Sequence, residues 1–385
     1  MIIFAEKTIT DMYIHQSEGW PHFTWDKSRI DSQLAVVNKA AGFLEGRLSA
    51  IGFDVQQRAA VEALTHDIVA SSEIEGVILN SDQVRSSIAR RMGVQITGET
   101  EPSHYIEGVV EMMIDATSGF KEPLTEDRLF GWHNCHFPTG RSGMSVIDVA
   151  KYRSAGMKVV SGMFGREKVH YEAPEADQVP VEMKSFLDWF NSTDTKADYI
   201  KSAIAHLWFV CIHPFDDGNG RIGRAIADMA LAQADESPLR FFSMSRQINK
   251  DTKSYYDELE RTSKGTCDIT NWIDWYLACM LRAIKGADEM LSSILDKAVF
   301  WQTYSQADIN ERQKKVLNIY LDGYIGKLTA KNWAKYADVS PDTAVRDVQH
   351  LTEIGVLVPQ EGRVRNIAYG IKISENKTLV PGLGL

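Results

Sequence analysis

One twelve-residue segment, residues 213–224, concentrates the groups that could do chemistry in this chain. It reads His-Pro-Phe-Asp-Asp-Gly-Asn-Gly-Arg-Ile-Gly-Arg. A histidine can act as a base near neutral pH, a carboxylate can bind a divalent cation, and a Gly-Asn-Gly turn can expose backbone N–H groups. Two arginines three positions apart add fixed charges that suit phosphate. Phosphoryl-type transfer needs these parts, because such enzymes work mainly by positioning and charge neutralisation.

The flanking sequence predicts that this segment joins two helices. Apolar residues recur at helical spacing over residues 198–211 and again over residues 222–234. Pro214 ends the first helix, and Gly218 and Gly220 give the backbone freedom of a tight loop. The loop therefore leads into a helix N-terminus, where free N–H groups and the helix dipole favour an anion.

The segment matches the pattern H-x-F-x-(D/E)-G-N-G-R-x-x-R and thereby resembles the Fic family, whose members mostly transfer AMP from ATP to protein hydroxyl groups. The resemblance implies a mainly α-helical core with a β-hairpin flap. It implies that His213 is the general base and that Asp217 is a ligand of Mg²⁺. The residues that would bind the ATP phosphates are Gly218, Asn219, Gly220, Arg221 and Arg224.

Two further features bear on the nucleotide. Family members that phosphorylate their targets carry lysine at the position of Gly220, whereas this chain keeps Gly220 and Arg224, as AMP-transferring members do. Residues 255–259 read Tyr-Tyr-Asp-Glu-Leu and resemble the family's segment beside the adenine pocket. A tyrosine face can stack on a base, so we expect Tyr256 to contact ATP. Simple packing of a tyrosine pair on a helix is the alternative.

A second motif predicts a built-in inhibitor. Residues 71–76 read Ser-Ser-Glu-Ile-Glu-Gly, which fits the inhibitory pattern (S/T)-x-x-x-E-(G/N) of Fic proteins. The resemblance implies that Glu75, flanked by Ser71 and Gly76, pairs with Arg224 and occupies the place of the γ-phosphate. The alternative is a glutamate near a helix end with Gly76 as its C-cap. In some relatives this glutamate also helps to remove AMP from a modified target, and the sequence leaves that activity open.

Two short extended pieces, residues 158–160 and 169–171, flank a glycine-rich turn and predict a hairpin. In Fic proteins a flap at this place aligns the side chain of the target. The resemblance therefore implies a flap from about Phe164 to Glu172. Aromatic residues near Trp20 offer either a partner-binding patch or core packing.

The last eighty residues predict a unit of another kind. A helix over residues 328–337 is followed by a turn, a second helix over residues 342–351 and a hairpin over residues 355–369. Ser340 would be the N-cap of the second helix, with Pro341 at its first position. This order resembles a winged helix-turn-helix. Its candidate DNA-reading residues are Thr343, Arg346 and Gln349 on the helix and Arg363 and Arg365 on the wing.

The length and net charge of the chain limit its possible domain organisation and partners. A chain of 385 residues suits two or three domains. We expect an N-terminal helical region at residues 1–115, a catalytic core at residues 116–300 and the winged-helix unit at residues 305–385. The net charge of −10 argues against a protein that coats nucleic acid without sequence preference. Residues 305–385 nevertheless carry 11 Lys and Arg against 9 Asp and Glu.

Composition also predicts the compartment. No apolar run approaches the roughly 20 residues that span a bilayer. The N-terminus becomes charged too early for a signal peptide. The four cysteines lack CxxC spacing and suit buried, reduced thiols. We therefore expect a cytoplasmic protein without a membrane partner.

These features combine into one leading hypothesis, an autoinhibited protein adenylyltransferase. It would transfer AMP from ATP and Mg²⁺ to a Ser, Thr or Tyr hydroxyl of a target protein or of itself. One alternative is a DNA-binding regulator with a sensory or relic Fic core, and another is a Fic enzyme that transfers a different nucleotide group. The resemblance also allows a homodimer. The sequence does not identify the target protein.

Overall fold

The computed structural model describes residues 12–49, 52–96, 98–162, 166–321, 326–360, 367–375 and 377–379. The fold is mainly helical, which confirms that part of the prediction, and it divides into two compact units, residues 1–287 and 288–385. None of the helices in these described ranges combines the length and apolar character that crossing a bilayer requires. The domain boundary expected near residue 115 stays a prediction.

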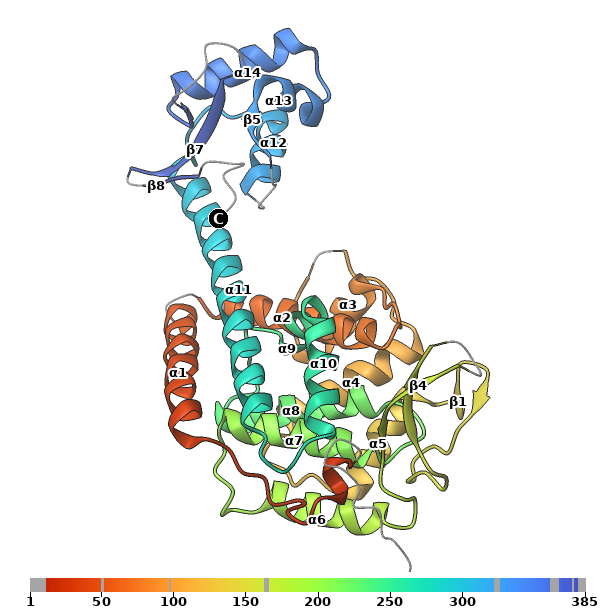
Figure 1. Cartoon of the computed structure of the whole chain (residues 1–385). Coiled ribbons are helices and arrows are strands. Elements are labelled where there is room, and N and C mark those ends of the chain that lie inside the picture. The colour runs from red at the N-terminus through yellow and green to blue at the C-terminus, as the bar shows by residue number, and fades with distance from the viewer. Residues whose placement is uncertain are drawn as a thin grey trace, which may run out of the picture. The chain divides into compact units, whose positions relative to one another are not determined.

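The first unit is built from helices around a shared apolar core (Figure 1). Side chains cap the starts of several of them, which ties local sequence to the helix boundaries: Asn80, Ser103, Thr125, Asp198 and Ser243. In chain order the helices are η2 (Ile14–Gln16), α1 (Lys27–Ser49), α2 (Phe53–Ile74), α3 (Ser81–Met92), α4 (His104–Ser118), α5 (Glu126–His136), α6 (Val179–Asn191), α7 (Tyr199–Ile212), α8 (Asn219–Ala234), α9 (Met244–Lys250) and α10 (Thr252–Ser263). The long helix α11 (Thr270–Thr303) begins in this unit and ends in the second.

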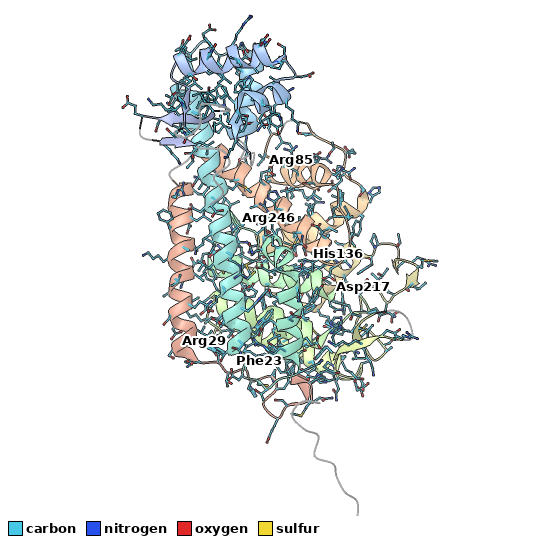
Figure 2. All side chains as sticks on the ribbon, turned by 45° about the horizontal axis from the view of Figure 1, so that its top comes forward. Phe23, Arg29, Arg85, His136, Asp217 and Arg246 are labelled. Atoms are coloured by element: carbon cyan, nitrogen blue, oxygen red, sulfur yellow. The ribbon has the colours of Figure 1, made fainter. Side chains whose placement is uncertain are left out.

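Helices α7 and α8 form the centre of the first unit. Nearly all of their side chains are buried, and α8 contacts α2, α4 and α5. Trp20 and Phe23 pack against Trp208 of α7, with ring centroids 6.1 and 5.6 Å apart. Core packing therefore accounts for these N-terminal aromatic residues. At the periphery, Arg29 of α1 forms an ion pair with Asp274 and joins α1 to α11 (Figure 2).

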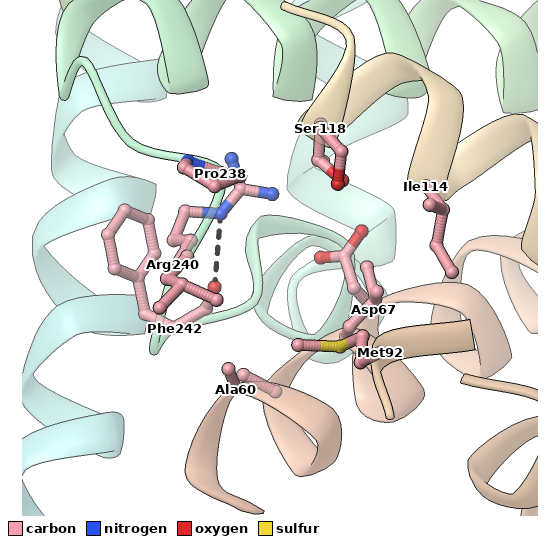
Figure 3. A pocket seen from close by; sticks show the side chains of 12 residues that line it. Ala60, Asp67, Met92, Ile114, Ser118, Pro238, Arg240 and Phe242 are labelled. Atoms are coloured by element: carbon pink, nitrogen blue, oxygen red, sulfur yellow. Dashed lines mark hydrogen bonds between the residues drawn. The ribbon is translucent and has the colours of Figure 1, made fainter. Parts of the chain in front are cut away.

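Helix α2 is anchored to the core by a buried carboxylate. Asp67 is 1% exposed and accepts hydrogen bonds from the Ser243 hydroxyl at 2.6 Å and from the backbone N–H and hydroxyl of Ser245 at 3.1 and 3.0 Å. Beside it lies a small cavity of about 90 Å³, which Arg240 and Phe242 also line (Figure 3). The position of α2 therefore depends on the segment that leads into α9.

Two strand pairs complete the first unit. β1 (Arg141–Ser142) pairs with β2 (Ser145–Val146), and β3 (Lys158–Ser161) pairs with β4 (Lys168–Glu172), all antiparallel. The register of the second pair shifts between Val159 and Val160. This pair coincides with the hairpin predicted from the sequence, although Phe164, the expected start of the flap, lies outside the described residues. Its role as a flap stays a prediction.

The second unit has its own core, which includes Trp333, Val348 and Ile371. The side chain of Ser340 caps α14 by accepting the N–H of Thr343, as predicted. The prediction of a helix from residue 328 is wrong at its start, because residues 328 and 329 form a strand that pairs with β7. The elements are α12 (Glu311–Leu321), β5 (Leu328–Thr329), α13 (Ala330–Ala337), α14 (Pro341–Glu353), β6 (Leu357–Pro359), β7 (Ala368–Ser374) and β8 (Lys377–Leu379), with β7 pairing antiparallel to β5, β6 and β8.

The winged helix-turn-helix identity of this unit stays a prediction. Arg346 and Gln349 are exposed on α14, whereas Thr343 is half-buried and its hydroxyl bonds that of Ser340. The two predicted wing arginines, Arg363 and Arg365, lie outside the described residues.

Candidate active site

The residues of the 213–224 segment lie at a cavity of about 560 Å³ in the first unit. This volume is in the range of small-molecule pockets. Several separate elements supply its walls: the C-terminal end of α2, the β3–β4 pair, the turn between α7 and α8, and α10. Of the predicted site residues, the lining includes Glu75, His213, Asp217, Gly218, Asn219, Gly220 and Tyr256.

His213 terminates α7 in a conformation that fixes its imidazole. Its φ of 52° lies in the left-handed region, which costs a non-glycine residue on the order of 1 kcal/mol. The ring Nδ1 lies 3.1 Å from the carbonyl oxygen of Val210 and donates to it, so Nε2 carries the free lone pair. Burial lowers the pKa of His213, which keeps the ring neutral near pH 7. The geometry therefore presents a base.

The turn after His213 is closed by backbone geometry and by one amide. Gly218 has a φ of 83°, and a Cβ there would lie 2.9 Å from the ring of Phe137. The Asn219 side chain accepts the N–H of Phe215 at 3.0 Å and donates to its carbonyl oxygen at 2.8 Å. Asn219 thus shapes the turn with its side chain, and its backbone N–H lies at the start of α8.

Helix α8 begins at Asn219, three residues earlier than predicted. The reason is local: Gly218 adopts the left-handed turn and the Asn219 amide holds the preceding backbone, so the helix starts despite the low propensity of Gly220. The first turn of a helix leaves N–H groups without carbonyl partners. At α8 these groups belong to Asn219, Gly220 and Arg221, of which the first two residues line the cavity.

Both arginines of the segment are buried and ordered by neighbours. Arg221 is 4% exposed, donates to the Tyr105 hydroxyl at 3.0 Å and lies 5.1 Å over the ring of Phe137. Arg224 is 3% exposed and donates to both the hydroxyl and the carbonyl oxygen of Ser71, at 2.8 and 2.7 Å. Within the described part of the chain, Nε of Arg221 and Nη1 of Arg224 have no hydrogen-bond partner. Each guanidinium therefore has donor capacity to spare.

Glu75 reaches the same cavity from the end of α2. Its Oε1 lies 2.9 Å from Nη2 of Arg224, and a Cβ on Gly220 would approach it to 2.1 Å. The carboxylate therefore lies directly against the start of α8. The alternative prediction also holds, because Gly76 adopts a φ of 75° and the N–H of Val77 bonds the carbonyl of Ser72, which is a Schellman ending. The helix end and the ion pair coexist.

Comparison with known proteins decides the family of this site. Residues 123–231 match the Fic/DOC family, and residues 13–94 match a domain of unknown function, DUF4172. The chain contains a Fic/DOC-family domain. Its predicted Fic resemblance is thereby confirmed.

Curated relatives are similar to part of the chain. Protein adenylyltransferase Fic of Nematostella vectensis is 25% identical over 241 residues, covering 59% of this chain and 49% of the relative. The same-named protein of Aedes aegypti is 25% identical over 237 residues, covering 59% and 42%. A crystal structure of a Fic family protein from Desulfovibrio desulfuricans G20 aligns with a TM-score of 0.49 at 20% identity, over 90% of this chain and 97% of that one. The chain thus spans about half the length of the curated relatives or less.

Asp217 is the one site residue predicted to bind a metal. In the described ranges, no three His, Cys, Asp or Glu side chains gather to hold an ion. The Asp217 side chain is 42% exposed at the cavity, and its carboxylate accepts the Ser142 hydroxyl and, at 2.5 Å, the N–H of Gly218. Mg²⁺ commonly binds one or two carboxylates together with phosphate oxygens and water. Asp217 therefore fits a cation that arrives with a nucleotide.

The two tyrosines of α10 differ in their exposure to the cavity. Tyr255 is 2% exposed and its hydroxyl bonds Nε2 of His206 at 2.8 Å, whereas Tyr256 is 45% exposed and lines the cavity. The hydroxyl of Tyr256 donates to the carbonyl oxygen of Ile74 at 3.4 Å, beside Glu75. Among the described tyrosines that line the cavity, Tyr171 and Tyr255 are buried, so Tyr256 is the one whose ring is open to a ligand.

Three residues that position the site by hydrogen bonds were not predicted from the sequence. Arg153 is 2% exposed and donates to the carbonyl oxygens of His213 at 2.8 Å and of Pro174 at 2.5 Å. His133 holds the carbonyl oxygen of Asp217 at 3.1 Å, and Tyr105 holds Arg221. Each lies at least 60 positions from the residue of the 213–224 segment that it contacts, so no local pattern in the sequence marks it.

Asp216 and Cys211 have structural roles beside the site. The carboxylate of Asp216 accepts the backbone N–H of Asp148 at 2.9 Å and connects the turn to the chain before β3. The thiol of Cys211 behaves as the sequence suggested, since burial raises its pKa to about 12 and leaves it unreactive.

Proposed function

We propose that this chain is a protein adenylyltransferase that its own α2 helix holds inactive. The observation that carries the proposal is the ion pair between Glu75 and Arg224, 2.9 Å long, at the cavity that also contains His213. The relatives named protein adenylyltransferase Fic support the reaction class. An anion that pairs with Arg224 competes with any phosphate for the same guanidinium.

In the proposed reaction, Nε2 of His213 accepts the proton of a target Ser, Thr or Tyr hydroxyl. The hydroxyl oxygen forms a bond to the α-phosphorus of ATP, and the bond from that phosphorus to the pyrophosphate oxygen breaks. Arg221 and Arg224, with the N–H groups at the start of α8, bind the phosphates. When Mg²⁺ is bound, it neutralises phosphate charge beside Asp217. The β3–β4 hairpin aligns the target.

The test follows AMP on protein. Wild type, Glu75→Gly and His213→Ala chains are incubated with α-labelled ATP and Mg²⁺, with and without a cell lysate as a source of targets. On lysate proteins, we expect strong labelling by Glu75→Gly, faint labelling by wild type and none by His213→Ala. Glu73→Gly is the matched control, because Glu73 lies at the same helix end but bonds Asn249. Its labelling should equal that of wild type.

Absence of label from every variant would overturn the proposed reaction. Equal labelling by wild type and Glu75→Gly would overturn the inhibitory role of Glu75 alone. A panel of other nucleotides, UTP among them, tests the alternative that the Fic domain transfers a different group, since the preferred donor should compete with ATP.

We also propose that the second unit is a winged helix-turn-helix that binds DNA. The exposed Arg346 and Gln349 of α14 support this role. The full chain should bind duplex DNA with an affinity that falls as salt rises, because phosphate contacts release counterions. Arg346→Ala should weaken binding about tenfold or more, within the range for a lost base contact. Lys314→Ala on α12 should have no effect, and salt-independent binding would contradict the proposal.

A further inference from the structure

A row of three hydrogen-bonded side chains lies at the mouth of the active-site cavity, and neither the motif nor the proposed reaction uses it. The hydroxyl of Ser161 on β3 lies 2.5 Å from Nε2 of His170 on β4. Nδ1 of the same ring lies 2.6 Å from a carboxylate oxygen of Glu260 on α10. All three residues line the cavity that contains His213.

The hairpin register explains why these groups meet. Ser161 lies opposite Lys168, so His170, two residues further along β4, is the diagonal neighbour of Ser161 on the same face. Lys168 and His170 both turn toward Glu260, which also pairs with Lys264 of its own helix. Side-chain contacts to Glu260 thus connect one face of the hairpin to α10.

Glu260 fixes the direction of the hydrogen bonds. Lys264, with His170 and Lys168, holds the pKa of Glu260 down to about 2, so this carboxylate is ionised and can only accept. Nδ1 of His170 must therefore donate to it. In the neutral ring, Nε2 is then the acceptor, and the Ser161 hydroxyl donates to it. A hydroxyl, an imidazole and an orienting carboxylate in this order form the arrangement of an activated nucleophile.

Packing alone does not account for this row. The Ser161 side chain is exposed at the cavity, whereas a serine whose hydrogen bond only stabilises the fold is usually covered by other side chains. The lining of the cavity includes one other serine, Ser263, and that residue is 5% exposed with its hydroxyl donated to the carbonyl oxygen of Glu260. Ser161 is the serine that combines access to the cavity with a base.

We propose that Ser161 is an internal acceptor of AMP, with His170 as its general base and Glu260 as the group that orients the base. The inference rests on the proposed adenylyltransferase reaction, which supplies ATP. The Ser161 oxygen forms a bond to the α-phosphorus, the bond to the pyrophosphate oxygen breaks, and pyrophosphate leaves with the electron pair. The serine proton passes to Nε2 of His170 and then to water.

Modification of Ser161 has a consequence for the site. The AMP group would stand on β3, on the face of the hairpin that borders the cavity, where a target side chain must approach. The modified chain would therefore transfer AMP to other proteins more slowly. Self-modification would then limit activity once α2 has released the site.

The experiment uses the full chain carrying Glu75→Gly, incubated with ATP and Mg²⁺, and locates AMP by intact mass and by peptide mapping. We expect one AMP on Ser161. Ser161→Ala should abolish AMP at this position, and Ser161→Thr should retain it because the hydroxyl remains. His170→Gln should slow the modification about 100-fold, the lower range for loss of a general base. Glu260→Gln should slow it less.

Ser185→Ala is the matched control, because Ser185 is an exposed serine of α6 that bonds only its own helix. It should leave modification of Ser161 unchanged, and thermal melting checks that every variant is folded. AMP on other residues but not on Ser161 would overturn this inference and leave the proposed function standing. Equal rates in the parent and His170→Gln would also overturn the assigned base. No AMP on any residue, with no pyrophosphate released, would overturn both.

Discussion

Glu75, at the end of α2, forms a 2.9 Å ion pair with Arg224 in the second turn of α8. The pair is asymmetric: the Arg224 side chain is 3% exposed, whereas that of Glu75 is 30% exposed. Arg224 is also held by Ser71, so the arginine keeps two hydrogen bonds when Glu75 moves away. When the carboxylate leaves, Arg224 thus stays hydrogen-bonded, but its buried charge loses its ion-pair partner.

Loss of the Ser71 hydroxyl should weaken this arrangement. Ser71→Ala removes the 2.8 Å bond from Nε of Arg224 and leaves a buried donor unsatisfied, which costs about 1–3 kcal/mol. We expect a lower unfolding free energy in urea and more AMP labelling than in wild type. Ser72→Ala is the matched control, since the buried Ser72 hydroxyl has no partner among the described residues. A Ser72→Ala effect as large as that of Ser71→Ala would contradict this reasoning.

The competition between Glu75 and phosphate can be measured without turnover. In a His213→Ala chain, Glu75→Gln should tighten ATP binding about tenfold, because Arg224 is freed for phosphate. In a His213→Ala chain that also carries Arg224→Ala, the same Glu75 substitution should change ATP affinity little. Calorimetric titration with ATP and Mg²⁺ gives both differences. An equal gain in the two backgrounds would mean that Glu75 acts through some other contact.

Local sequence predicted the helices and the turn because their causes are local. Apolar spacing located α7 and most of α8, and Pro214 marked the end of α7. The Ser340 cap was visible for the same reason, since a cap acts over three residues. The start of α8 was misplaced because the side chain of Asn219 bonds the backbone of Phe215, a contact that propensity does not include.

Contacts across long sequence separations could not be predicted. Tyr105 and Arg221 are 116 positions apart, and His170 and Glu260 are 90 positions apart. A lone tyrosine, histidine or glutamate is usually an ordinary surface or core residue, so its chemistry depends on the neighbours that the fold supplies. The pairing of Glu75 with Arg224 could be predicted only because the motifs of the family include both residues.

The pH dependence of AMP transfer should report His213. Its neutral form is the base, and burial lowers its pKa below the ordinary value of about 6.5. The negative charge of Glu75 raises the same pKa, so its removal shifts the pKa further down. In Glu75→Gly, the rate should therefore fall in acidic solution, with its half-maximal value below pH 6.5.

The pH experiment needs a separate measure of ATP binding, because phosphate protonation also changes with pH. Calorimetric titration of ATP into Glu75→Gly/His213→Ala over the same range provides it. A half-maximal rate above pH 6.5, with constant ATP affinity, would be incompatible with a half-buried, neutral His213 as the base.

The anchor of α2 at Asp67 should control the inhibitory end of the helix. Asp67 lies one turn before Ser71 and accepts three hydrogen bonds, so Asp67→Ala leaves Ser243 and Ser245 without their buried acceptor. A hydrogen bond to a charged group contributes about 1.5–3 kcal/mol, and we expect at least that loss in unfolding free energy. Because the end of α2 then holds Glu75 less firmly, AMP labelling should rise above that of wild type.

A control on the same helix separates anchoring from general damage to α2. The side chain of Glu62 is 43% exposed, and its carboxylate lies 3.8 Å from Arg85 in a surface ion pair, so Glu62→Ala should change stability by less than about 0.5 kcal/mol. AMP labelling by Glu62→Ala should match wild type. If Asp67→Ala lost stability without any gain in labelling, the anchor would support the fold but not the restraint on Glu75, and α2 would have to be released at its C-terminal end alone.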